Sequence, residues 1–255
     1  MTAKDWNPDS YARFRDLRLR PALDLLMQVG ALPQGSILDL GCGDGAAAGA
    51  LRARYPKHRL LGLDASPAML AKARGYARLI EADAASWQPD EPLSLIFSNA
   101  ALHWLPDHDA LLPRLASLLQ PGGVLAVQMP RQYDKPSHRF LRDIAAALHP
   151  GLFDFAGWKA PVRPAVAYWE LLAPLGEVQA WETDYVQHLP AVAGMHPVRA
   201  FTQSTTMRPF VEKLSPAQEA AYLSAYDTAL TSAYPLLPDG SALMPFRRVF
   251  FTLKV

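Results

Sequence analysis

Short apolar runs recur along the first half of the chain, and segments with a helical period separate them. The runs predict strands at 36–40, 59–64, 78–81, 93–97 and 123–129. Apolar residues three or four positions apart predict helices at 10–29, 46–54, 67–75 and around Leu111 to Leu119. Alternating strands and helices are typical of a parallel sheet that is covered by helices on both faces. We therefore expect a doubly wound α/β fold.

The pattern changes after Pro130. Further helices are predicted at 137–148, 165–173 and 216–234, and strands at 178–186 and 249–253. These last two strands would complete a seven-stranded, mostly parallel, Rossmann-like sheet. The simplest organisation is a sheet domain formed by residues 1–189 and 244–255. Residues 190–243 would then be an inserted helical lid that excludes water and forms part of a binding site.

Charge and composition favour a small-molecule partner. The chain has 25 Lys and Arg residues against 24 Asp and Glu residues, so it lacks the basic excess of nucleic-acid-binding proteins. No apolar segment approaches the ~20 residues of a membrane helix, and the first residues lack a signal-peptide pattern. We expect a cytoplasmic protein. The single cysteine, Cys42, excludes an internal disulfide and a multi-cysteine metal site, and no metal is expected.

The segment from Ile37 to Gly45 is the most informative part of the sequence, because an apolar run ends in a glycine-rich turn. Glycines at 41, 43 and 45 allow a sharp turn and a close approach of the backbone to a ligand. At a strand end of this fold, such a turn predicts a nucleotide-like ligand. The pattern also fits a dinucleotide site, with Asp64 as the ribose-binding acid, so a nicotinamide-dependent oxidoreductase is an alternative.

Carboxylates near the turn favour a cationic ligand. Asp39 stands two positions before the first glycine, where it would repel a pyrophosphate on the helix N-terminus. It would attract the sulfonium and ammonium groups of S-adenosylmethionine. Asp83 follows the third strand, where an adenine amino group needs an acceptor, and Pro121-Gly122-Gly123 leads into the fifth strand. Cys42 is interpreted as a small residue of the turn and not as a nucleophile.

In the order of these motifs, residues 37–129 resemble the class I S-adenosylmethionine-dependent methyltransferases. The resemblance implies that the turn holds the methionine end of the cofactor, Asp64 the ribose and Asp83 the adenine amine. Met69 would flank the adenine, although it is equally well explained as a core residue. The cofactor-binding residues implied in this way are Asp39, Gly41, Cys42, Gly43, Asp64, Ala65, Met69, Asp83, Ala84, Asn99 and Trp104.

Three further segments, 5–8, 102–107 and 124–130, are similar to the trans-aconitate 2-methyltransferases. That resemblance implies a carboxylate acceptor, which arginines bind through paired hydrogen bonds. Arg208 and Arg248 lie in segments that look like that family's, and they are the first candidates for binding the acceptor. Tyr11, Tyr133 and Tyr226 are further candidates, because their hydroxyls can hydrogen-bond carboxylates. Exposed arginines are more often solvated, and aromatic residues at helical spacing more often belong to a core.

A carboxylate acceptor is already ionised near neutral pH, so positioning and desolvation replace a general base, and no catalytic residue is predicted. His103 stands where the family often has Gln, which argues against an essential role for it. Two other functions fit the same motifs. One is a methyltransferase for another small carboxylic acid or an acyl thioester. The other is a catalytically silent sensor of an adenosyl ligand.

Overall fold

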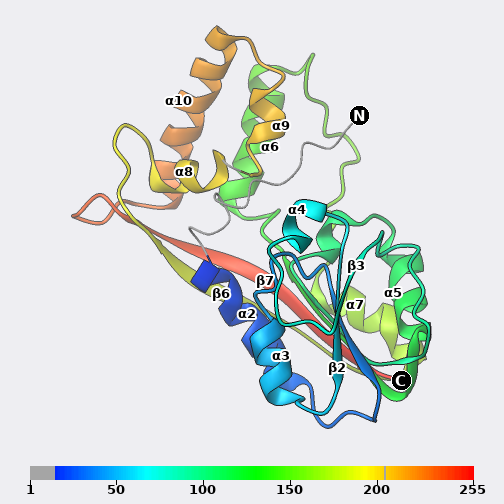
Figure 1. The fold of residues 1–255 in the computed structure, drawn as a ribbon. Helices are drawn as coiled ribbons and strands as arrows, with labels where there is room; N and C mark the ends of the chain where they lie inside the picture. The colour runs from blue at the N-terminus through cyan, green and yellow to red at the C-terminus, as the bar shows by residue number, and fades with distance from the viewer. Residues whose placement is uncertain (1–14, 204) are drawn as a thin grey trace. The chain divides into compact units, whose positions relative to one another are not determined.

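A computed structural model describes residues 15–203 and 205–255, and it confirms the predicted doubly wound α/β fold (Figure 1). Within this part of the chain, one seven-stranded sheet has the order β3-β2-β1-β4-β5-β7-β6. The strands are β1 (Ser36–Leu40), β2 (Arg59–Asp64), β3 (Arg78–Glu81), β4 (Leu93–Asn99), β5 (Leu119–Pro130), β6 (Glu177–Leu189) and β7 (Ala242–Lys254). The helices are α2 (Arg15–Gln28), α3 (Ala48–Arg54), α4 (Pro67–Leu70), η1 (Leu102–Trp104), α5 (His108–Ser117), α6 (Pro136–Leu148), α7 (Ala165–Leu172), η2 (Ala173–Leu175), α8 (Pro197–Gln203), α9 (Arg208–Val211) and α10 (Pro216–Ala233).

Several element boundaries differ from the sequence-based prediction: β5 begins at Leu119 and not at 123, β7 begins at Ala242 and not at 249, and two helices end early. The helix that was expected to reach Leu119 ends at Ser117, because Leu119 pairs with Leu93 and starts β5. The helix predicted over 67–75 ends at Leu70. Gly75 lies beyond that end with a φ of 92°, a left-handed conformation that a glycine adopts at little cost and that does not continue a helix.

Contacts divide the chain into two compact units, and the first unit contains most of the sheet. It consists of Met1–Pro130, Pro161–Thr183 and Val249–Val255. In its described part, β1 pairs in parallel with β2 on one side and with β4 on the other. The strand order therefore reverses between β1 and β4. In folds of this class, ligands bind at that reversal, outside the carboxyl ends of the strands.

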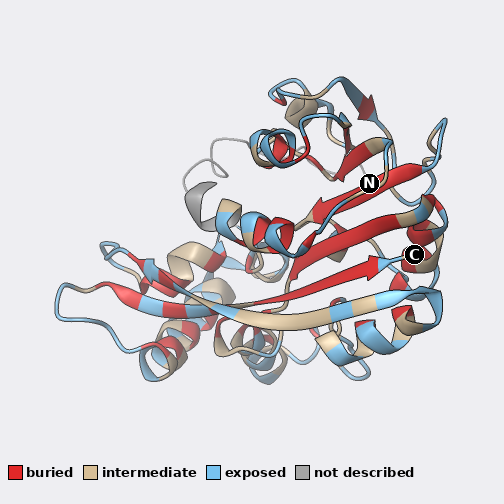
Figure 2. Cartoon of the chain, turned by 90° about the horizontal axis from the view of Figure 1, so that it is seen from below, coloured by how far each residue is buried: buried red, intermediate tan, exposed pale blue. Residues whose placement is uncertain are grey.

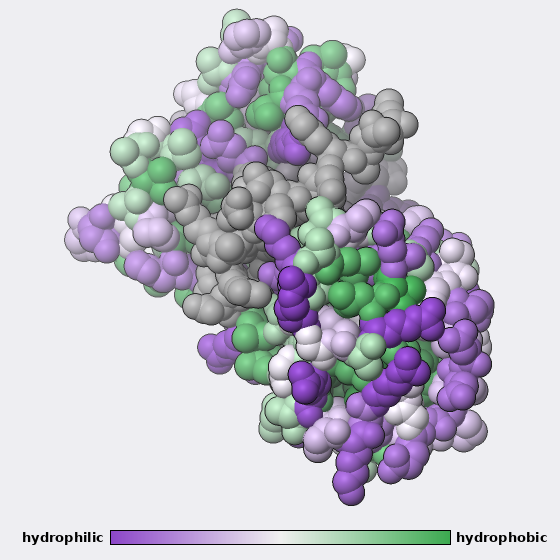
Figure 3. Space-filling model, in the orientation of Figure 1, coloured by the Kyte–Doolittle hydropathy of each residue, from purple (hydrophilic) through white to green (hydrophobic). Residues whose placement is uncertain are grey.

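The strands β1 and β4, whose carboxyl ends flank this reversal, are almost completely buried. Six of the seven residues of β4 are buried, as are four of the five residues of β1 (Figure 2). Continuous burial of both faces is expected of parallel strands covered by helices. On the face drawn in Figure 3, hydrophobic residues lie among hydrophilic ones. Among the described helices, none is long and apolar enough to cross a membrane.

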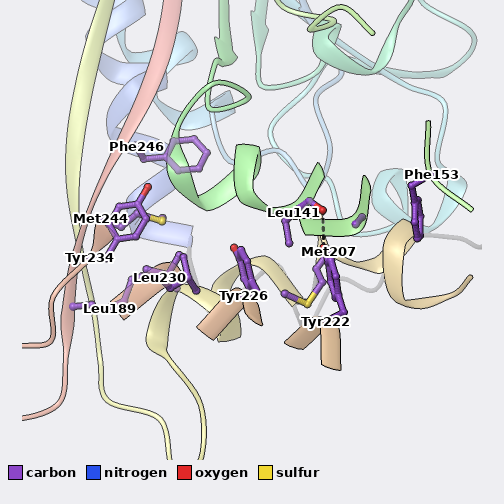
Figure 4. Close-up of a cluster of buried hydrophobic side chains, with 13 residues drawn as sticks. Leu141, Phe153, Leu189, Met207, Tyr222, Tyr226, Leu230, Tyr234, Met244 and Phe246 are labelled. Carbon is purple, nitrogen blue, oxygen red and sulfur yellow. Dashed lines mark hydrogen bonds between the residues drawn. The ribbon is translucent and has the colours of Figure 1, made fainter. Parts of the chain in front are cut away.

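The second unit has a hydrophobic core of its own. It consists of Arg131–Ala160 and Asp184–Arg248, and α10 packs on both α6 and α8 within it. Buried side chains from these helices and from β6 and β7 form a cluster that includes Leu141, Tyr222 and Tyr226 (Figure 4). This unit contains the predicted insertion 190–243, and it also includes residues 131–160. The function of the insertion as a lid stays a prediction.

A buried histidine makes the stability of the second unit dependent on pH. Burial, reinforced by the nearby Arg142, lowers the pKa of His138 from 6.5 to about 3. The unfolded chain binds a proton at this residue below pH 6.5, whereas the folded chain does not. The free energy of unfolding should therefore fall as the pH drops below 6.5, by at most about 1.4 kcal/mol per pH unit.

Urea unfolding at pH 7 and pH 5 tests this prediction. His138→Gln should show a smaller loss of stability between the two pH values than the natural chain. His188, which is exposed in the same unit, provides the control, and His188→Gln should keep the original loss. A loss of equal size in the His138 variant and the natural chain would contradict the prediction.

Candidate active site

The glycine turn folds over the end of the neighbouring strand β2. The backbone amides of Gly41 and Cys42 both donate to the carbonyl oxygen of Leu63, at 2.8 and 2.9 Å. Gly41 has a φ of 74°, and a Cβ atom at this position would overlap Cβ of Ala101. The turn after β1 therefore touches the segment after β4. This close approach requires a glycine at position 41.

The carboxylate of Asp64 joins two turns at the same edge of the sheet. Its Oδ2 atom accepts a hydrogen bond from the amide of Gly43 at 2.8 Å, and its Oδ1 atom accepts one from the amide of Ser66 at 2.9 Å. Ser66 caps α4, because its hydroxyl oxygen accepts from the amide of Met69. A Cβ atom at Gly43 would lie 3.3 Å from the terminal methyl of Met69. Three predicted cofactor residues, Gly43, Asp64 and Met69, are thus neighbours.

Asp39 is buried beneath this turn. Its side chain is 2 % exposed, and its Oδ2 atom accepts a hydrogen bond of 2.6 Å from the hydroxyl of Tyr76. Burial raises the pKa of Asp39 to about 7, the Tyr76 hydrogen bond opposes that rise and the charge of Asp64 adds to it. Burial also raises the pKa of the Cys42 thiol, which stays protonated. Cys42 is therefore a small structural residue of the turn.

The sequence-based prediction does not include Tyr76. This residue lies between α4 and β3, and its partner Asp39 is 37 positions away in the chain. One signal was present in the sequence, namely Gly62 within an otherwise apolar strand. A glycine inside a strand often marks a place where another group approaches closely. Here the groups that approach are the ring of Tyr76 and the side chain of Leu79.

The carboxyl end of β4 carries a buried polar atom. The Oδ1 atom of Asn99 is buried and has no hydrogen-bond partner among the described residues. The next residue, Ala100, has a φ of 55°, which is uncommon for a residue other than glycine. Buried acceptors are nearly always paired in folded proteins, and backbone strain concentrates at functional sites. Both features are typical of functional sites, and the role of Asn99 in binding the cofactor stays a prediction.

The other predicted cofactor residues follow the carboxyl ends of β2, β3 and β4, on loops or, for Trp104, at the end of η1. Asp83 follows β3 and is exposed, and its Oδ1 atom accepts a hydrogen bond from the amide of Ala85 at 2.8 Å. The carbonyl oxygen of Ala84 accepts a hydrogen bond from the guanidinium of Arg114. Ala65 separates Asp64 from Ser66. Trp104 follows β4, is 60 % exposed and has its ring 4.5 Å from that of His103.

Four of the five predicted acceptor residues fall in the second unit, and Tyr11 lies outside the described residues. Tyr226 is fully buried within the cluster drawn in Figure 4. Its hydroxyl donates to the carbonyl oxygen of Ser137 at 2.6 Å. The structure thus explains this tyrosine as a core residue. Burial raises the pKa of Tyr133 to about 12, and its ring packs against those of His138 and Trp158.

The two predicted arginines have different environments. Arg208 is 51 % exposed, and its Nε atom lies 2.7 Å from Oε1 of Glu212 one helical turn away. Arg248 is 5 % exposed, with its guanidinium carbon 5.1 Å from the centre of the Phe246 ring. Its neighbour Arg247 binds both oxygens of Asp184, at 2.8 and 2.7 Å. Arg248 is therefore the more deeply buried of the two predicted arginines.

Comparison with known proteins agrees with this description. A family model described as a methyltransferase domain matches residues 37–123. The structure is similar to the YcgJ protein of Bacillus subtilis, with a TM-score of 0.58, 14 % identity and coverage of 94 % of this chain and 98 % of that one. It is also similar to phosphoethanolamine N-methyltransferase 2 of Haemonchus contortus in complex with S-adenosyl-L-methionine. That likeness has a TM-score of 0.50, 18 % identity and coverage of 92 % and 52 % of the two chains.

Sequence relatives are similar over nearly the whole length. Trans-aconitate 2-methyltransferases from Methylobacterium radiotolerans and Shigella flexneri are 44 % and 38 % identical to this chain, and each match covers 98 % of both proteins. The fold, the glycine turn and the matching family model define a Rossmann-like methyltransferase. More narrowly, the chain belongs to the trans-aconitate 2-methyltransferase family.

The close contact between Gly41 and Ala101 generates a prediction about stability. Gly41→Ala should destabilise the protein, because the left-handed backbone costs an alanine roughly 1–2 kcal/mol and the new methyl group must displace Ala101. Gly49→Ala is the control, since Gly49 lies inside α3 with open space around it. It should stabilise the protein by up to about 1 kcal/mol. Urea unfolding measures both changes, and equal changes would contradict the assignment.

Proposed function

We propose that this chain transfers the methyl group of S-adenosylmethionine to a carboxylate of trans-aconitate. The products are the monomethyl ester and S-adenosylhomocysteine. Membership in the family supports the proposal, as does the methyl donor present in the complex of the Haemonchus enzyme. One structural observation carries it. The glycine turn, the bridging carboxylate of Asp64 and the unpaired oxygen of Asn99 occupy the carboxyl ends of adjacent strands.

The residues at this edge fit the methyl donor. The buried Oδ1 atom of Asn99 is an acceptor that needs a donor, and an ammonium group supplies N–H donors. Asp39 and Asp64 provide negative charge for a ligand with a sulfonium and an ammonium group. Asp83 can accept from the adenine amine through its second oxygen, and Met69 can flank the ring. When bound, the donor supplies an activated methyl group on a positively charged sulfur.

The acceptor needs little activation, so the protein contributes mainly by positioning it. A carboxylate is ionised near neutral pH and requires no general base. Arg248 is suited to holding a carboxylate, because a charge pair is stronger in its buried environment than in water. Arg208 would exchange Glu212 for a substrate carboxylate. Tyr133 is a further candidate contact, whereas the hydroxyl of Tyr226 is already used inside the core.

The inserted residues 190–243 are proposed to act as a lid. They belong to the same unit as both arginines, and this unit has an independent hydrophobic core. Exclusion of water would strengthen the attraction between arginine and carboxylate. It would also remove hydration water from the carboxylate oxygen that attacks the methyl group. The predicted donor residues lie in the first unit, and the described acceptor candidates lie in the second.

Incubation with trans-aconitate and methyl-labelled S-adenosylmethionine should give a labelled ester. Other small carboxylic acids and an acyl thioester, offered in parallel, separate this function from that of a methyltransferase with a different acceptor. Calorimetric titration with S-adenosylmethionine and with NAD separates it from an oxidoreductase. Tight binding of S-adenosylmethionine with no ester formed from any acceptor would favour the sensor function and would exclude the proposed reaction.

Replacement of Arg208 tests the acceptor assignment. Arg208→Ala should raise KM for trans-aconitate roughly tenfold or more, which corresponds to about 1.4 kcal/mol or more, with little change in the Kd of the methyl donor. Arg139→Ala is a matched control, because Arg139 is 52 % exposed and forms the same one-turn pair with Asp143. Initial rates at varied acceptor concentration measure the effect. An unchanged KM, or a parallel rise in the donor Kd, would remove Arg208 from this role.

A further inference from the structure

The ring of Tyr76 occupies a space formed by two glycines. A Cβ atom at Gly62, within β2, would lie 2.9 Å from Cδ1 and 3.0 Å from Cε1 of the tyrosine ring. A Cβ atom at Gly45, in the glycine turn, would lie 3.2 Å from Cε2. In any other residue at position 62, the Cβ atom would lie closer to the ring than non-bonded atoms normally approach. The ring therefore contacts both β2 and the turn that the proposal assigns to the methyl donor.

This placement brings the Tyr76 hydroxyl to Asp39. In the parallel register, Gly62 of β2 lies beside Asp39 of β1, so a ring packed on the glycine reaches the carboxylate of the next strand. The resulting hydrogen bond is 2.6 Å long. A buried carboxylate is costly unless it is hydrogen-bonded. Burial and the charge of Asp39 raise the pKa of Tyr76, so the hydroxyl stays protonated and remains a donor.

We propose that Tyr76 is a positioning residue of the methyl-donor site, which acts by favouring the ionised form of the Asp39 carboxylate and by fixing that carboxylate beneath the glycine turn. Gly62 provides the space for its ring. The inference rests on the proposed methyl donor, because a cationic ligand is what an ionised Asp39 would favour. It extends that proposal by Tyr76, which lies outside the glycine motif, and by Gly62, which lies inside β2.

The groups that face Asp39 determine how its ionisation responds to pH. Tyr76 comes from the segment before β3, Asp64 from the end of β2 and Cys42 from the turn. The neighbour on β4 is the apolar residue Phe97. Tyr76 lowers the pKa of Asp39, whereas burial and Asp64 raise it. Loss of the Tyr76 hydroxyl should therefore raise this pKa, so that more of the protein carries a neutral Asp39 at pH 7.

Calorimetric titration of Tyr76→Phe with S-adenosylmethionine provides the test. At pH 7 the Kd should rise about tenfold, in line with the loss of a hydrogen bond to a charged group. The affinity should recover as the pH rises toward 9, so the midpoint of the pH dependence moves upward. Titrations in two buffers of different ionisation enthalpy count the protons released. At pH 7 the variant should release more protons than the natural chain. KM for the acceptor should stay unchanged.

Two further variants test whether the effect is specific to the hydrogen bond between Tyr76 and Asp39. Tyr55→Phe removes another buried hydroxyl of the first unit, which bonds to the carbonyl oxygens of Val29 and Gly30. It should leave the donor Kd and its pH midpoint unchanged. Gly62→Ala keeps the Tyr76 hydroxyl, but its Cβ atom would press on the tyrosine ring and, at 3.0 Å, on Cδ2 of Leu79. The displaced ring should change both quantities in the same direction as Tyr76→Phe. Thermal unfolding of each variant verifies that it is folded before titration.

The outcomes separate this inference from the proposed function. If the natural chain does not bind S-adenosylmethionine, the proposed donor is wrong. If the natural chain binds it and folded Tyr76→Phe has the same Kd, pH midpoint and proton release, the positioning role of Tyr76 is overturned. A tenfold loss of affinity that is the same at every pH would also overturn it, because it would indicate a structural role without an effect on Asp39. Should Tyr76→Phe fail to fold, the Gly62→Ala titration decides by the same criteria.

Discussion

Two backbone amides from different turns share the carboxylate of Asp64. One belongs to Gly43, in the turn after β1, and the other to Ser66, at the start of α4. A glycine-rich turn has great conformational freedom, and its geometry needs an external constraint. Asp64 provides that constraint, because its own strand is held in parallel register beside β1. The positions of Met69 over Gly43 and of Gly41 against Ala101 both depend on the turn that it fixes.

The first three strands were predictable because their local sequence determines them. The bounds of β1, β2 and β3 coincide with the predicted ranges, because each strand is a short apolar run between turn residues. The start of β5 was not predictable in the same way. Leu119 continues a helical spacing of leucines, and only its pairing with Leu93 in another strand makes it extended. Pairing between distant segments decides the structure where the local pattern fits both a helix and a strand.

The same distinction applies to the candidate site. The spacing of Asp39, the glycines and Asp64 is a local motif, and the structure places these residues together. Tyr76 contributes through a partner 37 residues away, and its position depends on the register of β1 and β2. For Tyr226 the sequence allowed a core residue or a binding residue. Its hydrogen bond to the carbonyl oxygen of Ser137 explains it as a core residue, which no spacing along the helix could reveal.

Charge gives a physical reason for keeping the predicted donor and acceptor residues apart. The proposed donor is cationic and the proposed acceptor is anionic, so one site needs carboxylates and the other needs arginines. Carboxylates and arginines on one unit would tend to pair with each other, as Arg247 does with Asp184. The predicted carboxylates Asp39, Asp64 and Asp83 lie in the first unit, and the predicted arginines Arg208 and Arg248 lie in the second. The neutral hydroxyl of Tyr76 holds Asp39 without cancelling its charge. Glu212 pairs with Arg208 in an exposed ion pair, which a substrate carboxylate can replace.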